Sequence, residues 1–172
     1  VFSPDGRRLA MQADRGDVVR VWQLAERIAD PLTVTGDVDH RPLAFSPDSL
    51  ELLTRDGPED SRVRRWTLGD PREGQVIDTV PGDTTAIFLP RGDRLVLTER
   101  KERLKGWRLF ALAPTGHWQP QRTVEIATPE DSLFVACSDS WLVASLTRAE
   151  ISAWNIADGD DRGLRSDLPD CT

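Results

Sequence analysis

The side chains best suited to acid–base, nucleophilic or metal chemistry are few in this sequence and lie far apart. Its only histidines are His40 and His117, and its only cysteines are Cys137 and Cys171. No Gly-x-Ser-x-Gly nucleophile turn, phosphate-binding glycine loop or His-Glu-x-x-His zinc motif is present. Two cysteines placed this way indicate neither a disulfide framework nor a metal site. The sequence therefore predicts no catalytic residue, no metal and no cofactor.

Charged side chains are much more abundant, and they limit the kinds of partner. The 29 acidic residues outnumber the 22 basic ones, which gives a net charge of −7. An acidic surface disfavours nonspecific binding to nucleic acid or to anionic membranes. No apolar run approaches the roughly 18–20 residues that cross a bilayer. We expect a protein or peptide partner, no nucleic acid and no membrane. The basic residues are 20 Arg and 2 Lys, a bias typical of GC-rich coding sequences and hence of a bacterial source.

A turn and a tryptophan recur along the sequence, and they define the elements that position the charged side chains. The turn occurs as Phe2-Ser3-Pro4-Asp5-Gly6, Phe45-Ser46-Pro47-Asp48-Ser49 and Phe88-Leu89-Pro90-Arg91-Gly92, and a degenerate fourth copy begins at Phe134. The tryptophans that close the four copies are Trp22, Trp66, Trp107 and Trp154. A period near 44 residues with one turn and one tryptophan per unit is typical of propeller blades. We expect the four tryptophans at equivalent third-strand positions, packed between neighbouring blades.

Each unit reads as strands separated by turn residues, with no helical period. The second unit predicts strands at 41–45, 50–54, 62–68 and 75–80, and the third at 84–88, 94–98, 104–109 and 122–126. The fourth predicts strands at 132–136, 141–145 and 150–156, with no clear outer strand. The first unit lacks nearly all of its first strand. The sequence thus predicts an all-β fold, a β-propeller fragment of about four blades. Each blade is expected to be a four-stranded antiparallel sheet, in units near 1–40, 41–83, 84–129 and 130–172. Because the chain begins inside a blade, we expect other blades or domains of a longer chain as its neighbours.

The turn, the apolar second strand and the third-strand tryptophan resemble the WD-repeat family of β-propellers. The resemblance covers the whole chain and is strongest in residues 1–110. Two family features are missing: no Gly-His pair precedes the first strands, and the Asp after Trp is replaced. The replacing residues are Gln23, Thr67, Arg108 and Asn155. These departures argue against the His-to-Asp network that stiffens each blade in that family.

The resemblance also implies a partner-binding face. In the family, the loops before the first strands and the loops joining the second and third strands share one face. The acidic residues that map to the former are Asp37, Asp39, Asp83, Glu130 and Asp131. The basic residues that map to the latter are Arg15, Arg55, Arg100, Lys101 and Arg103, and Arg41 begins a first strand beside His40, where both are expected to face the channel. Either this rim binds a charged partner, or its pairs replace the missing histidine networks and serve only stability.

An insertion at 110–121 carries His117 and Trp118 on the opposite face. The tryptophan is either exposed, where it would anchor a partner, or folded back onto its own blade, and the sequence leaves both open.

These features favour a non-enzymatic interaction scaffold, or a sensor or regulatory propeller module, within a larger cytoplasmic protein. The alternative is an enzyme-type propeller, such as a lactonase, a dehydrogenase or the gating domain of a peptidase.

Overall fold

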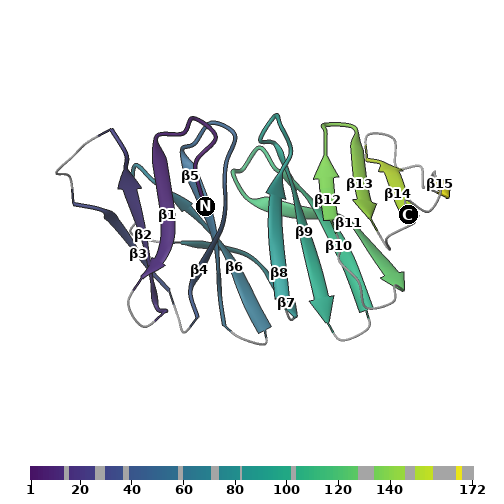
Figure 1. Ribbon diagram of the computed structural model, residues 1–172, viewed down its shortest axis with the longest axis horizontal. Helices are drawn as coiled ribbons and strands as arrows, with labels where there is room; N and C mark the ends of the chain where they lie inside the picture. Colours follow the sequence, from purple (N-terminus) through teal and green to yellow (C-terminus); the bar gives the residue numbers. More distant parts are fainter. Residues whose placement is uncertain are drawn as a thin grey trace, which may run out of the picture.

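Four antiparallel sheets follow one another along the chain. The computed structural model describes residues 1–13, 16–25, 30–36, 39–57, 60–70, 74–81, 83–101, 104–127, 134–145, 150–156 and 166–167, and these contain strands but no helix. Each sheet is drawn from consecutive strands in chain order, and we call the sheets blades 1 to 4. The sheets stand side by side in a row (Figure 1). The prediction of an all-β propeller fragment is confirmed.

Blade 1 has three strands and the other blades have four. Blade 1 comprises β1 (Arg8–Ala13), β2 (Val18–Gln23) and β3 (Leu32–Thr35). Blade 2 comprises β4 (Arg41–Phe45), β5 (Glu51–Asp56), β6 (Asp60–Thr67) and β7 (Gln75–Pro81). Blade 3 comprises β8 (Asp83–Phe88), β9 (Arg94–Lys101), β10 (Leu104–Leu112) and β11 (Trp118–Ala127). Blade 4 comprises β12 (Phe134–Cys137), β13 (Trp141–Ser145), β14 (Glu150–Asn155) and β15 (Ser166–Asp167).

The repeated turn folds through its serine and aspartate side chains. In blade 2, the hydroxyl of Ser46 accepts the main-chain N–H of Glu51 at 2.9 Å and donates to the carboxylate of Asp48 at 2.6 Å. That carboxylate also accepts the N–H of Leu50 at 3.0 Å, and these two hydrogen bonds, the hydroxyl first, lower the pKa of Asp48. The turn ends in a left-handed residue, Ser49, with φ of 62°, where the other two copies have glycine.

Hydrophobic cores lie between neighbouring blades among the described residues, and blade 2 shares one core with blade 1 and another with blade 3. Between blades 1 and 2 the buried residues are Ala10, Val19, Val21, Val34, Phe45, Leu52 and Trp66. Between blades 2 and 3 they are Leu53, Val63, Ala86, Leu95, Leu97, Phe110 and Trp118. Within a blade, alternate residues of a strand serve opposite cores, as the pleat requires.

Strand register corrects one tryptophan of the repeat. In blades 1 and 2 the third-strand aromatic lies opposite a leucine that follows the turn phenylalanine by seven residues, as in the pairs Leu9 with Trp22 and Leu52 with Trp66. In blade 3 the corresponding Leu95 lies opposite Phe110, whereas Trp107 lies opposite Thr98. Trp107 is fully buried but sits three residues earlier, which places it on the other face of the strand. The expectation of four equivalent tryptophans is therefore wrong for Trp107.

The fourth copy of the turn is also displaced from the expected position. In blade 4, Leu142 pairs with Cys137 on one side and with Trp154 on the other. In blade 2, Leu52 pairs in the same way with Phe45 and Trp66, so Cys137 takes the position that Phe45 has in blade 2. Phe134 lies three residues before this position, at the start of β12. The turn of blade 4 is shorter, with Ser138 N–H bonded to the carbonyl of Trp141. With both corrections, the third-strand aromatics recur every 44 residues, at Trp22, Trp66, Phe110 and Trp154.

Candidate functional site

A cluster of charged side chains lies at one end of blade 2, around the start of β4 and the turn between β5 and β6. We call it the rim cluster, and its members are Asp39, Arg41, Arg55, Asp56, Arg62 and Arg64. Antiparallel pairing brings these segments together, since Arg41 lies opposite Arg55 and Asp56 lies opposite Arg62. The cluster formally carries four guanidinium groups and two carboxylates, so it is locally cationic on an acidic protein.

Asp39 organises the first half of the rim cluster. It adopts a left-handed conformation with φ of 59°, which aspartate tolerates better than most residues. Its carboxylate receives the Nε–H of Arg41 at 2.7 Å and lies 3.8 Å from a guanidinium nitrogen of Arg55. The amide nitrogen of Gln12 in blade 1 lies 3.5 Å from the same carboxylate. Arg55 is buried, whereas the side chain of Arg41 is 51% exposed. Arg55 therefore serves stability, and Arg41 faces solvent.

Asp56 organises the second half. Its side chain is fully buried, and its carboxylate accepts the Nε–H of Arg64 at 3.0 Å and lies 3.8 Å from a guanidinium nitrogen of Arg62. Arg62 and Arg64 alternate along β6, so they emerge on the same face of the strand. The side chain of Arg62 is 44% exposed. A second solvent-facing guanidinium thus lies on the same rim as Arg41. The sequence reasoning missed Asp56, Arg62 and Arg64, although the Arg-x-Arg spacing on a predicted strand would have placed the two arginines together.

Of the other rim residues expected from the sequence, Asp83 and Arg100 are direct partners across β8 and β9, at the same end of blade 3. Lys101 follows at the last position of β9. The remaining five, Arg15, Asp37, Arg103, Glu130 and Asp131, lie outside the described residues.

A buried hydrogen-bonded chain of three side chains supports the rim cluster. His40 is fully buried, and its Nε2 lies 2.7 Å from the hydroxyl of Thr54, which accepts the indole N–H of Trp66 at 2.8 Å. The ring centroids of the imidazole of His40 and the indole of Trp66 are 5.8 Å apart. The glycines Gly36 and Gly74 leave room for these rings, because a Cβ at either position would lie 2.6 Å from ring atoms. This arrangement corrects two expectations: His40 does not face the channel, and blade 2 does contain a histidine network.

Protonation of His40 follows from its surroundings. Burial lowers the pKa of His40, while the charge of Asp56 and the main chain of Asp17 act in the opposite direction. Since the Thr54 oxygen already accepts the indole N–H, its own proton is free to be donated to Nε2 of His40. We therefore assign the neutral tautomer with its proton on Nδ1.

The segment that carries His117 and Trp118 is a hairpin turn. β10 continues to Leu112 and β11 begins at Trp118, so the expected insertion consists mostly of strand, with a bulge at Leu109 and Phe110. Trp118 is buried in the core between blades 2 and 3, with its ring 6.0 Å from that of Phe88. The tryptophan is therefore folded back rather than exposed as an anchor.

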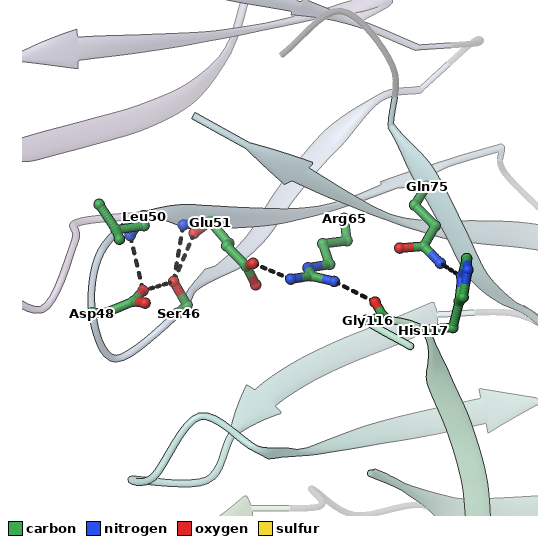
Figure 2. A network of polar contacts seen from close by, with 8 residues as sticks. All are labelled: Ser46, Asp48, Leu50, Glu51, Arg65, Gln75, Gly116 and His117. Carbon is green, nitrogen blue, oxygen red and sulfur yellow. Dashed lines mark hydrogen bonds and ion pairs between the residues drawn. The ribbon is translucent and has the colours of Figure 1, made fainter. Parts of the chain in front are cut away.

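The same turn is bonded to the neighbouring blade. Figure 2 shows Arg65 of β6 placed between Glu51, with which it forms an ion pair, and the carbonyl of Gly116, to which it donates at 2.9 Å. His117 bonds to Gln75 at the start of β7. This network joins blades 2 and 3 at the end opposite to the rim cluster.

Within the described part of the chain, no three histidine, cysteine, aspartate or glutamate side chains gather as a metal site would require. The same residues include no helix of the length and apolarity needed to cross a membrane.

Comparison with solved structures gives the class of protein. The chain matches no protein-family model and no curated protein sequence. It is similar to a putative 6-phosphogluconolactonase from Bacteroides uniformis, with 17% identity and a TM-score of 0.63, over 96% of this chain and 52% of the other. It is similar to a chain of the mitotic checkpoint complex, with 19% identity and a TM-score of 0.64, over 91% and 49%. A functionally unknown protein from Desulfotomaculum acetoxidans has 12% identity and a TM-score of 0.63, over 92% and 51%.

At these identities the likeness concerns the fold, which is that of a β-propeller. The chain spans about half the length of the structures it matches.

Proposed function

We propose that this chain is part of a non-enzymatic, protein-binding propeller of the WD-repeat kind, and that its rim cluster binds an acidic segment of the partner. The observation that carries this proposal is the pair of half-exposed guanidinium groups on one rim, Arg41 and Arg62. Arg41 is paired with the partly exposed Asp39, and Arg62 lies beside the buried Asp56. Guanidinium groups suit carboxylate partners, since they donate two parallel hydrogen bonds. By strand register, Arg100 and Lys101 lie at the same end of blade 3, with Asp83 opposite Arg100.

The wider setting is part of the same proposal. One similar chain belongs to the mitotic checkpoint complex, a multiprotein assembly, which agrees with a role in protein binding. We place the module in the cytoplasm, as a sensor or regulatory part of a larger bacterial protein.

Binding of a fluorescein-labelled glutamate-rich peptide, followed by fluorescence anisotropy, tests this function. The double variant Arg41→Ala/Arg62→Ala should weaken binding at least about fivefold, which corresponds to about 1 kcal/mol. The loss should shrink with added salt, because the Debye length is about 8 Å at physiological ionic strength.

The matched control is Arg7→Ala/Arg91→Ala, which removes the same charge from exposed positions on the turns of blades 1 and 3. Equal weakening by both double variants would show that net charge alone attracts the peptide and would refute the rim site.

A lactonase-type enzyme is the second candidate, and its support is the likeness to the putative 6-phosphogluconolactonase. Hydrolysis of 6-phosphogluconolactone by the purified chain, followed by acid release, separates the two. Turnover that survives the Arg41→Ala/Arg62→Ala change would favour the enzyme.

A further inference from the structure

Asp39 uses its two carboxylate oxygens for two different arginines of the rim cluster. Oδ1 accepts the Nε–H of Arg41 at 2.7 Å, and the amide nitrogen of Gln12 lies 3.5 Å from the same oxygen. Oδ2 lies 3.8 Å from a guanidinium nitrogen of the buried Arg55. Side chains from three strands, β1, β4 and β5, therefore surround this carboxylate.

The main chain also determines where the carboxylate of Asp39 lies. Its φ of 59° is in the left-handed region, which aspartate, asparagine and glycine tolerate better than other residues. The next residue, His40, is fully buried, so a shift of the chain here would also move the imidazole. Both features place the side chain of Asp39 beside Arg41 before any partner binds.

Arg41 keeps one edge of its guanidinium group available. The group has one N–H donor at Nε and four at the two Nη atoms, and Asp39 accepts the Nε donor. Within the described part of the chain, Asp39 is the only residue that bonds to the side chain of Arg41, which is 51% exposed. The Nη–H groups are therefore available to the two oxygens of a carboxylate.

We infer, on the basis of the proposed binding of an acidic segment, that Asp39 is a positioning residue that fixes the guanidinium of Arg41 for a carboxylate of the partner. A long side chain that becomes ordered on binding costs about two- to tenfold in affinity. Since Asp39 already holds Arg41, much of this loss is avoided. Charge alone predicts the opposite effect of Asp39, because a carboxylate beside the site repels an acidic partner.

Asp39→Asn and Asp39→Gly form a matched pair that separates the two effects. Both remove the same negative charge, both remove it from Arg55 alike, and both new residues tolerate the left-handed backbone. Only asparagine keeps a side-chain oxygen that accepts the Nε–H of Arg41. Asp39→Gly should therefore bind the labelled glutamate-rich peptide about two- to tenfold more weakly than Asp39→Asn does. Fluorescence anisotropy measures the affinities, and the melting temperatures of the same samples verify that both variants are folded.

The same pair in the Arg41→Ala background shows whether Asp39 acts through Arg41. In that background Asp39→Asn and Asp39→Gly should bind the peptide equally, since the side chain that Asp39 positions is gone. A difference that persists there would mean that Asp39 only stabilises the loop, and it would overturn the positioning role.

Two further outcomes would also refute this role. If Asp39→Gly binds the peptide more tightly than Asp39→Asn, the side chain of Asp39 competes with the partner for Arg41. If Asp39→Asn and Asp39→Gly bind alike while Arg41→Ala/Arg62→Ala still weakens binding, the rim site stands and only the positioning role is wrong. If that double variant binds as the unchanged protein does, the proposed function is wrong and the positioning role is refuted with it.

Discussion

Thr54 is the residue on which the interior of blade 2 depends most directly. Its hydroxyl is fully buried and serves two partners, the indole N–H of Trp66 and Nε2 of His40. Buried polar groups of this kind stabilise little while they are paired and cost much when one partner is removed. At the equivalent repeat position blade 1 has Met11 and blade 3 has Leu97, so neither of these blades has a hydroxyl there.

Thr54→Val should therefore lower the free energy of unfolding by about 2–4 kcal/mol, since it keeps the shape and leaves two buried groups unpaired. Urea denaturation measures this change. Thr54→Ser is the control: it keeps the hydroxyl and should cost only about 1 kcal/mol for the lost methyl group. Equal stability of the two variants would contradict the network.

His40 predicts how stability depends on pH. Its pKa is lowered below 6.5 in the folded state because the ring is buried, so the unfolded chain binds a proton first as the pH falls. Stability should accordingly be complete above about pH 7 and decrease as the pH falls through 6.5 and below. Urea midpoints measured between about pH 8 and about pH 5 report this loss.

His40→Gln should remove this part of the pH dependence, whereas His117→Gln, at an exposed position, should leave it unchanged. The pKa values of Asp5 and Asp48 are lowered below 3.8 in the folded state, so the stability that these carboxylates add is present above pH 3.8 and is lost only below it, outside this window. A stability that stays constant down to about pH 5 would contradict a buried neutral His40.

At the scale of elements, turn chemistry predicted more of the fold than aromatic residues did. The Ser-Pro-Asp turn helped to predict β4 with its observed bounds, and the apolar run at 141–145 predicted β13 with its observed bounds. Trp107 and Phe134 misled the prediction, because an aromatic ring fits either face of a strand, and only hydrogen-bond register shows which face it occupies. Phe110 and Cys137 were missed for the same reason. The rim cluster was predicted in part, since Asp39, Arg41 and Arg55 lie beside the turns, whereas Asp56 and Arg62 come together only through pairing.

Close packing of β3 and its following loop onto His40 makes Gly36 sensitive to any side chain. A Cβ at Gly36 would lie 2.6 Å from the imidazole ring, which is buried and has no space to move. Gly36→Ala should lower stability by about 1–3 kcal/mol through overpacking. Gly69→Ala is the matched control, because its added methyl group meets nothing within 4 Å. Thermal denaturation of the pair should show the loss for Gly36→Ala alone.

At the scale of the molecule, each blade depends on its neighbours. The cores lie between sheets, so no single blade has an interior of its own, and stability propagates from one interface to the next. Polar contacts at the turns also join neighbouring blades. Arg8 reaches the carbonyl of Ser49 in blade 2, and Arg94 reaches the carbonyl of Ile156 in blade 4, at 3.3 Å.

Trp118→Ala tests the dependence between blades 2 and 3. The indole fills the core that these blades share, so its loss should cost about 3–5 kcal/mol. Trp141→Ala, at a tryptophan that is 37% exposed, should cost about 1 kcal/mol or less. Guanidinium denaturation of both variants gives the comparison. Similar losses would mean that Trp118 does not join the two sheets.

The distribution of tryptophan along the arc also has an optical consequence. The chain has six tryptophans and no tyrosine, and every blade holds at least one: Trp22, Trp66, Trp107 with Trp118, and Trp141 with Trp154. Ultraviolet emission therefore comes from indole alone, and a chain that keeps one tryptophan emits from one blade. Trp66 is the most informative of these probes. Its ring lies 5.8 Å from the imidazole of His40, and a protonated imidazole at that range quenches indole emission. The brightness of Trp66 thus reports the charge of a histidine that solvent does not reach.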